Sequence, residues 1–198
     1  MASGSGNGMF RWSLIAAVTL IALAAGCFLN PVTGENNARS AALFTRLVPV
    51  LQHPRCINCH TSTDFPWQGD DGHRHIMQVK RGPADRGVAA LPCSTCHQAR
   101  NSPAGVPGAE GWHLAPPRMA WEGLTASAIC RSLTDPARGG MTPAQIVHHM
   151  STDHIVLWAW NPGLDLNGTA RQPPPISHAA FSALVRQWVA AGATCPRD

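Results

Sequence analysis

The sequence predicts a mostly α-helical fold with long loops, in a chain whose 198 residues suffice for one domain. Helical periodicity in several segments, and 18 Gly plus 17 Pro that interrupt the chain, support this prediction. A hydrophobic fraction of 44% excludes a disordered or fibrous protein. The net charge of +4 comes without a dense basic run, so we expect no nucleic-acid partner.

The N-terminus has the pattern of an export signal, because an apolar run over 12–29 follows Arg11. The run is short for a membrane-spanning helix, which needs roughly 20 apolar residues. Residues 23–27 resemble the lipobox of bacterial lipoproteins, in which the cysteine becomes lipidated. We therefore expect an export signal at 1–27 with lipidation at Cys27, while simple cleavage and an uncleaved anchor remain alternatives. All three predict a periplasmic or other extracytoplasmic location for the rest of the chain.

The first half of the chain after this signal combines one helical segment with long irregular ones. Residues 28–36 predict a linker, because they are rich in Asn, Pro and Gly. Apolar residues recur at helical spacing over 38–51, where Pro49 predicts a kink or a new turn. Residues 61–92 and 98–118 are rich in Gly and Pro without a sustained period, and they predict loops wrapped around a cofactor.

The second half carries three helix start signals. Thr125 can cap a first helix, Thr142 starts a second with a capping box and Pro143 at its first position, and Ser177 can cap a third. The apolar tract 155–160 favours a further helix over a strand. These helices, with the one before them, are expected to supply the core of a domain over 37–198.

The distribution of cysteine and histidine is the unusual feature of the composition, with seven Cys and ten His. Four of the cysteines form two copies of the pattern C-x-x-C-H, which is the attachment motif of c-type haem. Two thiols one helical turn apart can each bond a haem vinyl group, and the adjacent imidazole can then ligate the iron. Half of a zinc site or a redox dithiol are the alternatives. The predicted attachment residues are Cys56, Cys59, His60, Cys93, Cys96 and His97.

The two motifs are close in sequence, since 37 residues separate His60 from His97. This is too short for two complete copies of an ordinary single-haem domain. We therefore expect a compact domain in which both haems share one core and lie near enough for direct electron exchange.

Each haem iron needs a second axial ligand or stays open for chemistry. We expect His75, in the loop between the motifs, to ligate one iron and His149, on the helix begun by Thr142, to ligate the other. His113 and Met119 are held in reserve. The remaining candidates are His53, His73, His148, His154, His178, Met77, Met141 and Met150.

The two cysteines outside the signal and the motifs are Cys130 and Cys195. In an oxidising compartment such a pair is expected to form a disulfide, with two buried thiols as the alternative. The tryptophans are expected to pack around the haem edges and the core.

The chain resembles the di-haem c-type cytochromes of bacteria, and more narrowly an exported group labelled isoquinoline 1-oxidoreductase subunits. The likeness covers nearly everything from about Val50 to Pro196. The residues that carry it are 53–60, 68–71 with His75, 81–83, 112–114, 158–163 and 192–196. The resemblance implies haem binding at both motifs. The label implies a partner, namely a molybdenum hydroxylase that would pass electrons to this chain.

The sequence thus favours an exported di-haem c-type cytochrome that carries single electrons from a periplasmic dehydrogenase to a downstream acceptor. Its cofactors would be two covalently bound haem c groups, and its partners redox proteins. A haem enzyme of the peroxidase kind, with one open iron, is the alternative, and a zinc-binding lipoprotein is a third.

Overall fold

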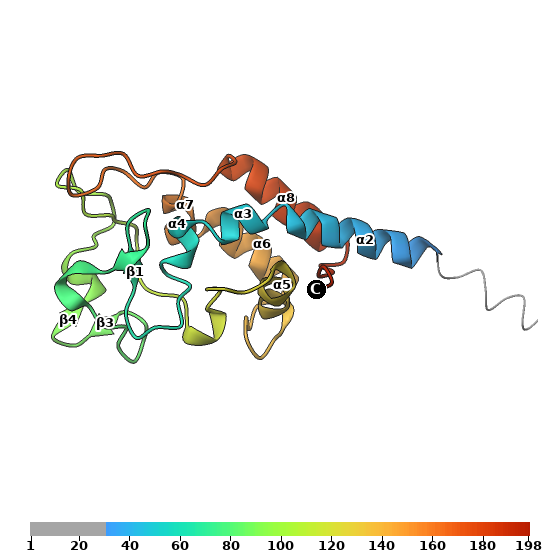
Figure 1. The fold of residues 1–198 in the computed structure, drawn as a ribbon, viewed down its shortest axis with the longest axis horizontal. Coiled ribbons are helices and arrows are strands. Elements are labelled where there is room, and N and C mark those ends of the chain that lie inside the picture. The colour runs from blue at the N-terminus through green and yellow to red at the C-terminus, as the bar shows by residue number, and fades with distance from the viewer. Residues whose placement is uncertain (1–30) are drawn as a thin grey trace, which may run out of the picture.

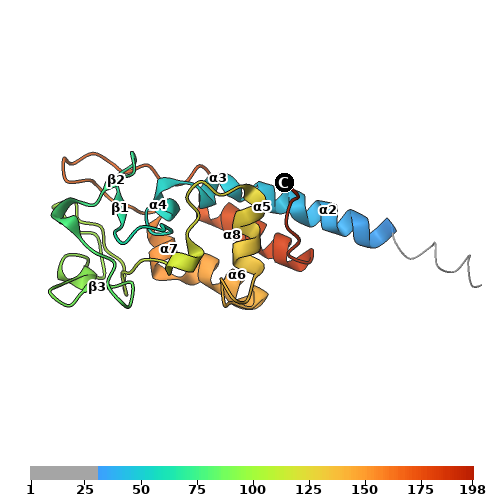
Figure 2. The ribbon, with the colours of Figure 1, turned by 60° about the horizontal axis from the view of Figure 1, so that its bottom comes forward.

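The computed structural model describes residues 31–198, which are partly helical with few strands and form a compact fold. Helices α2, α5, α6 and α8 lie together at one end, and the short strands and long loops lie at the other (Figure 1). The view in Figure 2 shows the same division, with α4 and α7 between the two ends. The helices are α2 (Pro31–Thr45), α3 (Val48–Leu51), α4 (Pro54–Ile57), α5 (Ala126–Thr134), α6 (Pro143–Thr152), α7 (His154–Trp158) and α8 (His178–Ala190).

The export signal expected at 1–27, including Cys27, lies outside the described residues. The linker expected at 28–36 is wrong in its second part, because α2 begins at Pro31. Proline suits the first turn of a helix, where its missing N–H would lack a partner anyway. The predicted break at Pro49 is confirmed, because α2 ends at Thr45 and Pro49 lies in the first turn of α3.

The helix starts predicted in the second half of the chain are confirmed. Thr125 and Ser177 accept backbone hydrogen bonds as N-caps of α5 and α8. Thr142 and Gln145 form a complete capping box at α6. The tract at 155–160 is helical through Trp158, in α7. Capping groups satisfy the free N–H groups of a first turn, so these short helices begin where the sequence indicates.

The hydrophobic core lies between the helices. Phe44 of α2 and Trp188 of α8 are fully buried, and their ring centres are 5.0 Å apart. The hydroxyl of Ser40 donates a hydrogen bond of 3.2 Å to the Trp188 carbonyl, which fixes α2 against α8. In the part of the chain that is described, no helix is long and apolar enough to cross a membrane.

A disulfide joins Cys130 of α5 to Cys195 in the segment after α8. The two Cα atoms are 5.5 Å apart, and Cys130 has no exposed surface. The predicted pairing is therefore present, rather than two buried thiols. It closes a loop over 65 residues and holds the C-terminal segment against the helical core.

The loop end contains two antiparallel hairpins of two-residue strands. Strand β1 (Trp67–Gln68) pairs with β2 (His73–Arg74), and β3 (Gly87–Val88) pairs with β4 (Leu91–Pro92). Gly82 has a φ of +71°, and a Cβ there would meet the Gly87 carbonyl oxygen at 2.0 Å, so this close approach requires glycine.

Arg81 organises the loops from inside, and its side chain is buried. Its guanidinium donates to the carbonyls of Thr63, Thr61 and Ala115 and pairs with Asp85 at 2.7 Å. A single arginine thus links three segments that have no regular structure of their own. This scaffold positions Thr61 and Thr63, which directly follow the first C-x-x-C-H motif.

Candidate functional site

Both C-x-x-C-H motifs form one helical turn, although they lie in different parts of the fold. The first motif includes the end of α4, where the Cys56 carbonyl accepts from the N–H groups of Cys59, at 3.2 Å, and His60, at 3.0 Å. The second starts in a 3₁₀ turn over Cys93–Thr95. There the Cys93 carbonyl accepts from the N–H groups of the cysteine and the histidine that follow, at 3.3 and 3.0 Å. The two motifs therefore share one backbone conformation.

Each motif opens onto a cavity. We call the first cavity the space lined by Cys56, Cys59 and His60. The second cavity is lined by the other motif, with Cys93, Cys96 and His97. Cys59 lines both cavities, so they are adjacent.

The histidines of both motifs are held in the same way. The Nδ1–H group of His60 donates to the Met119 carbonyl at 2.7 Å, and that of His97 donates to the Pro107 carbonyl at 2.8 Å. A carbonyl can only accept, so Nδ1 carries the proton and the Nε2 lone pair stays free. Metal-ligating histidines have this arrangement, with one nitrogen fixed by a hydrogen bond and the other on the metal.

The environment also keeps both imidazoles neutral. Burial lowers the pKa of His60 to about 4, the hydrogen bond to Met119 opposes this, and the nearby His149 lowers it further. Burial likewise lowers the pKa of His97. A neutral imidazole is the form that ligates a metal, so both residues are in the required state at neutral pH.

Each of these imidazoles stacks on a tryptophan. His60 lies parallel to Trp121 within 10°, with ring centres 3.5 Å apart, and His97 lies parallel to Trp112 within 3°, at 4.5 Å. The indole N–H of Trp121 donates to Ser132 at 3.1 Å, which fixes that ring. The sequence predicted tryptophans around the cofactor in general. It held no signal for these two pairs, because each tryptophan follows its histidine at a different distance along the chain.

The second cavity brings His75 opposite His97. Their ring centres are 6.0 Å apart, with 69° between the planes, and His75 lines the same cavity. The Nδ1–H group of His75 donates to the Ile76 carbonyl at 2.5 Å, so its Nε2 is free as well. Met77, two residues on, has a φ of 65°, a left-handed conformation that non-glycine residues rarely adopt. This turn keeps His75 at the cavity.

The first cavity brings His149 near His60, since both line it and the charge of His149 lowers the pKa of His60. The Nδ1 atom of His149 is 3.5 Å from the carboxylate of Asp153, a contact typical of a metal-ligating histidine. His149 is half-buried on α6, beside the buried Met150. The structure therefore places this predicted ligand at the cavity of the first motif.

The two reserve candidates also line a cavity. His113 lines both cavities, and its Nδ1–H group donates to the Gly111 carbonyl at 2.7 Å. Met119 lines the first cavity, but its carbonyl accepts from His60, so its backbone lies on the side of the attachment histidine. Met77 lines the second cavity, and Met141 and Met150 line the first. The cavity linings do not include His53, His73, His148, His154 or His178.

The four motif thiols are free. Burial raises the pKa of Cys56 to about 12 and that of Cys59 to about 11, and it also raises the pKa of Cys93. A catalytic dithiol needs a lowered thiol pKa, so these environments oppose the dithiol alternative. Proximity to Cys93 contributes to the shift at Cys59, which agrees with the adjacency of the two cavities.

A haem iron receives four ligands from the porphyrin and needs at most two from the protein. The free Nε2 atoms and the paired thiols beside each cavity fit such a group. Among the described residues, 31–198, no group of three or more His, Cys, Asp or Glu side chains converges in a way that could hold a metal ion by itself.

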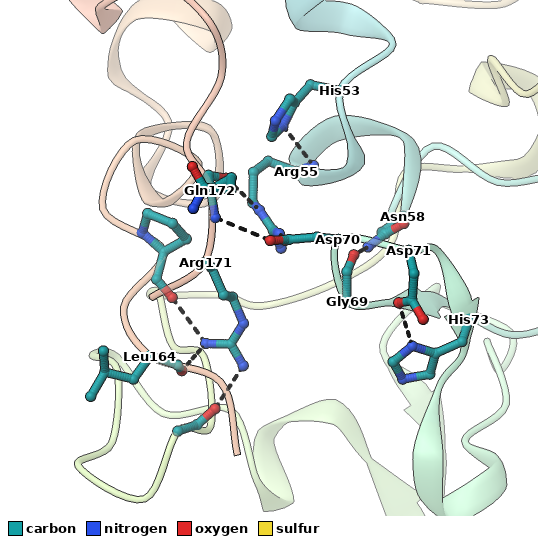
Figure 3. Close-up of polar contacts among 12 residues, drawn as sticks. His53, Arg55, Asn58, Gly69, Asp70, Asp71, His73, Leu164, Arg171 and Gln172 are labelled. Carbon is teal, nitrogen blue, oxygen red and sulfur yellow. Dashed lines mark hydrogen bonds and ion pairs between the residues drawn. The ribbon is translucent and has the colours of Figure 1, made fainter. Parts of the chain in front are cut away.

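Sequence reasoning missed two groups of polar residues, one beside the first motif and one at the cavities. Glu122 accepts hydrogen bonds from the segment that directly follows His60. Arg55 lines both cavities and pairs with Asp70, and Arg171 lines the second (Figure 3). Only the position of Arg55 beside Cys56 gave a signal in the sequence.

Comparisons with known proteins add no relative. No family model, no curated protein and no solved structure matches this chain.

Proposed function

We propose that this chain is an exported di-haem c-type cytochrome that carries single electrons. The observation that carries the proposal is the repeated arrangement around each motif. In both, a one-turn C-x-x-C-H segment opens onto a cavity, and its neutral imidazole has a free Nε2. A second imidazole lines each cavity as well.

The residues have separate roles in this proposal. The four motif thiols form thioethers with the haem vinyl groups, and His60 and His97 ligate the two irons. When bound, each haem supplies an iron that accepts and releases one electron. His149 and His75, which line the two cavities, would supply the second protein ligand to each iron.

The protein controls the cofactors by position and surroundings. Trp121 and Trp112 stack on the two attachment imidazoles and hold their orientation. The shared residue Cys59 supports a short distance between the two haems, as expected for direct electron exchange. Both haems would then act as one relay within the domain over 37–198.

The proposal places the chain outside the cytoplasm, with a lipid on Cys27 as the membrane tether. The disulfide agrees with an oxidising compartment. Its partners would be redox proteins, and the resemblance to isoquinoline 1-oxidoreductase subunits makes a molybdenum hydroxylase the donor to test first. A peroxidase-like enzyme needs one open iron, and the second imidazole in each cavity favours the carrier instead.

The test is expression of the full chain with a c-type haem attachment system. We expect a protein that stains for haem after denaturing electrophoresis, with a mass increased by two haems. The variants Cys56→Ala/Cys59→Ala and Cys93→Ala/Cys96→Ala should each retain one haem. A mature wild-type chain with the mass of the bare polypeptide would refute the proposal, and one high-spin haem that binds cyanide would favour the enzyme.

A further inference from the structure

Two arginines lie at the cavities without sufficient negative charge around them. Arg55, at the start of α4, lines both cavities, and its side chain is only 2% exposed. Arg171, in the loop before α8, lines the second cavity. Figure 3 shows both side chains in the polar cluster that joins these segments. Buried cations are costly unless an anion or a set of hydrogen bonds compensates them.

Arg55 is only partly compensated. Its Nε donates to the Gln172 carbonyl at 3.1 Å, and its Nη2 pairs with Asp70. Among the described residues, the buried Nη2 has no hydrogen-bond partner besides this ion pair. Asp70 is 45% exposed and also accepts from the Gln172 N–H at 3.2 Å. A single, half-exposed carboxylate therefore faces a nearly fully buried guanidinium.

Arg171 is also only partly compensated, because the charge of Asp165 does not fully offset the burial that lowers its pKa. It donates to the carbonyls of Gly105, at 2.7 Å, Pro162, at 3.0 Å, and Leu164, and within residues 31–198 it forms no ion pair. Burial lowers the pKa of Arg55 to about 10, and the positive charge of Arg171 lowers it further. The two cations are thus close enough to repel each other, and an anion between them would remove this cost.

We infer that Arg55 and Arg171 bind the carboxylates of the two porphyrins, and that Arg55 contacts both haems. The inference rests on the proposed function. Arginine is suited to this role because its planar guanidinium can donate two parallel hydrogen bonds to one carboxylate. Arg55 lines both cavities and would therefore contact both haems, whereas Arg171 lines only the second cavity and would contact only the second haem.

A cation beside a haem also stabilises the reduced iron, which carries less positive charge than the oxidised iron. Loss of the Arg55 charge should therefore lower both reduction potentials, and loss of the Arg171 charge should lower only that of the second haem. Arg186 is exposed on α8 and lines neither cavity, so it provides the matched control.

The experiment uses the two single-haem proteins, with Cys93→Ala/Cys96→Ala or Cys56→Ala/Cys59→Ala. In each we would measure the reduction potential and the resonance Raman band of the propionate groups. Arg55→Gln should lower the potential in both, and Arg55→Lys, which keeps the charge, should still shift the propionate band in both. Arg171→Gln should lower the potential, and Arg171→Lys should shift the propionate band, only in the protein that retains the second haem. The same two substitutions at Arg186 should change neither quantity in either protein.

Propionate bands that Arg55→Lys leaves unchanged in either protein would overturn the inference. Asp70→Asn tests it with Arg55 intact: release from its carboxylate should strengthen the contact and shift the band, and an unchanged band again contradicts it. Acetate should leave the wild-type propionate bands unchanged. If acetate shifts these bands and Arg55→Lys abolishes the shift, the two arginines bind a soluble anion instead of the propionates. Absence of haem from the wild type refutes the proposed function instead, so the two failures are distinguishable.

Discussion

The imidazole of His75 faces that of His97 with 6.0 Å between the ring centres. Both rings direct Nδ1–H to a backbone carbonyl, which leaves both Nε2 atoms free. An imidazole nitrogen lies about 2 Å from a metal ion that it ligates, and its ring centre lies about 1 Å further, so two ligands on opposite sides of one metal are about 6 Å apart. This spacing is the reason to assign both residues to one iron.

The first prediction is that His75→Ala converts the second haem to a high-spin state and leaves the first haem low-spin. His75 is the imidazole that lies opposite His97, so its removal would leave that iron without its sixth ligand. The oxidised optical and electron paramagnetic resonance spectra should show loss of about half of the low-spin signal. His73→Ala is the matched control, because His73 pairs with Asp71 and lines neither cavity. A native spectrum of His75→Ala would refute the assignment.

The second prediction concerns the other haem. His149→Ala should turn the first haem high-spin, whereas His148→Ala, on the exposed side of the same helix, should not. His113→Ala separates the two candidates at this cavity. If it abolishes the low-spin signal of the first haem while His149→Ala preserves it, His113 is the ligand and our assignment is wrong.

The third prediction concerns the disulfide. Cys130→Ser/Cys195→Ser removes a covalent link that spans 65 residues, and the loss of unfolding free energy should be about 4 kcal/mol on the loop-entropy estimate. Urea unfolding followed by circular dichroism measures this directly. Reductant should destabilise the wild type and have no effect on the double variant. Equal stability of the two proteins would mean that the pair adds nothing.

The fourth prediction concerns the tether. Cys27→Ser should move the protein from the membrane fraction to the soluble periplasmic fraction, because the lipid would be attached at that sulfur. Mass spectrometry of the N-terminal peptide provides an independent measurement. Unchanged fractionation, together with a wild-type peptide that lacks a lipid, would show that the signal is cleaved or retained without lipidation.

Features that depend on local chemistry were predictable from the sequence. Thr125, Thr142 and Ser177 each act on the next helical turn, so their capping roles follow from a few neighbouring residues. The same holds for the turn of each C-x-x-C-H motif. Loop position and helix face agree with the positions of His75 and His149 at the cavities, whereas their role as ligands stays a prediction.

Features that depend on packing between distant segments were not predictable. The stack of His60 on Trp121 joins residues 61 positions apart, and the contact of Arg55 with Gln172 joins residues 117 apart. Nothing in the local pattern indicates such partners, because the loops between them adopt no repeating structure. The prediction of a linker over 28–36 also failed from Pro31 onward, because proline favours both loops and the first turns of helices.

Glu122 is another such long-range contact, and it fixes the chain beside the first haem motif. Its carboxylate accepts from the Ser62 N–H at 2.7 Å, the Thr61 hydroxyl at 2.5 Å and the indole N–H of Trp67. Burial raises the pKa of Glu122, but these hydrogen bonds outweigh burial, so that the pKa lies below the usual 4.5. The charged form is therefore the one that holds the loop.

The fifth prediction follows from this pKa. A carboxyl group whose folded-state pKa is lowered contributes stability above its unfolded value of about 4.5 and loses it as the pH falls through the folded value. Glu122→Gln should thus reduce the unfolding free energy at pH 7 by about 1–2 kcal/mol, since it replaces charged hydrogen bonds by weaker ones. Between pH 5 and 3 the wild type should lose stability more steeply than the variant.

Glu110→Gln, which replaces an exposed carboxylate that pairs with His154, is the control for this prediction. Parallel stability curves for wild type and Glu122→Gln would show that the carboxylate charge does not hold this loop.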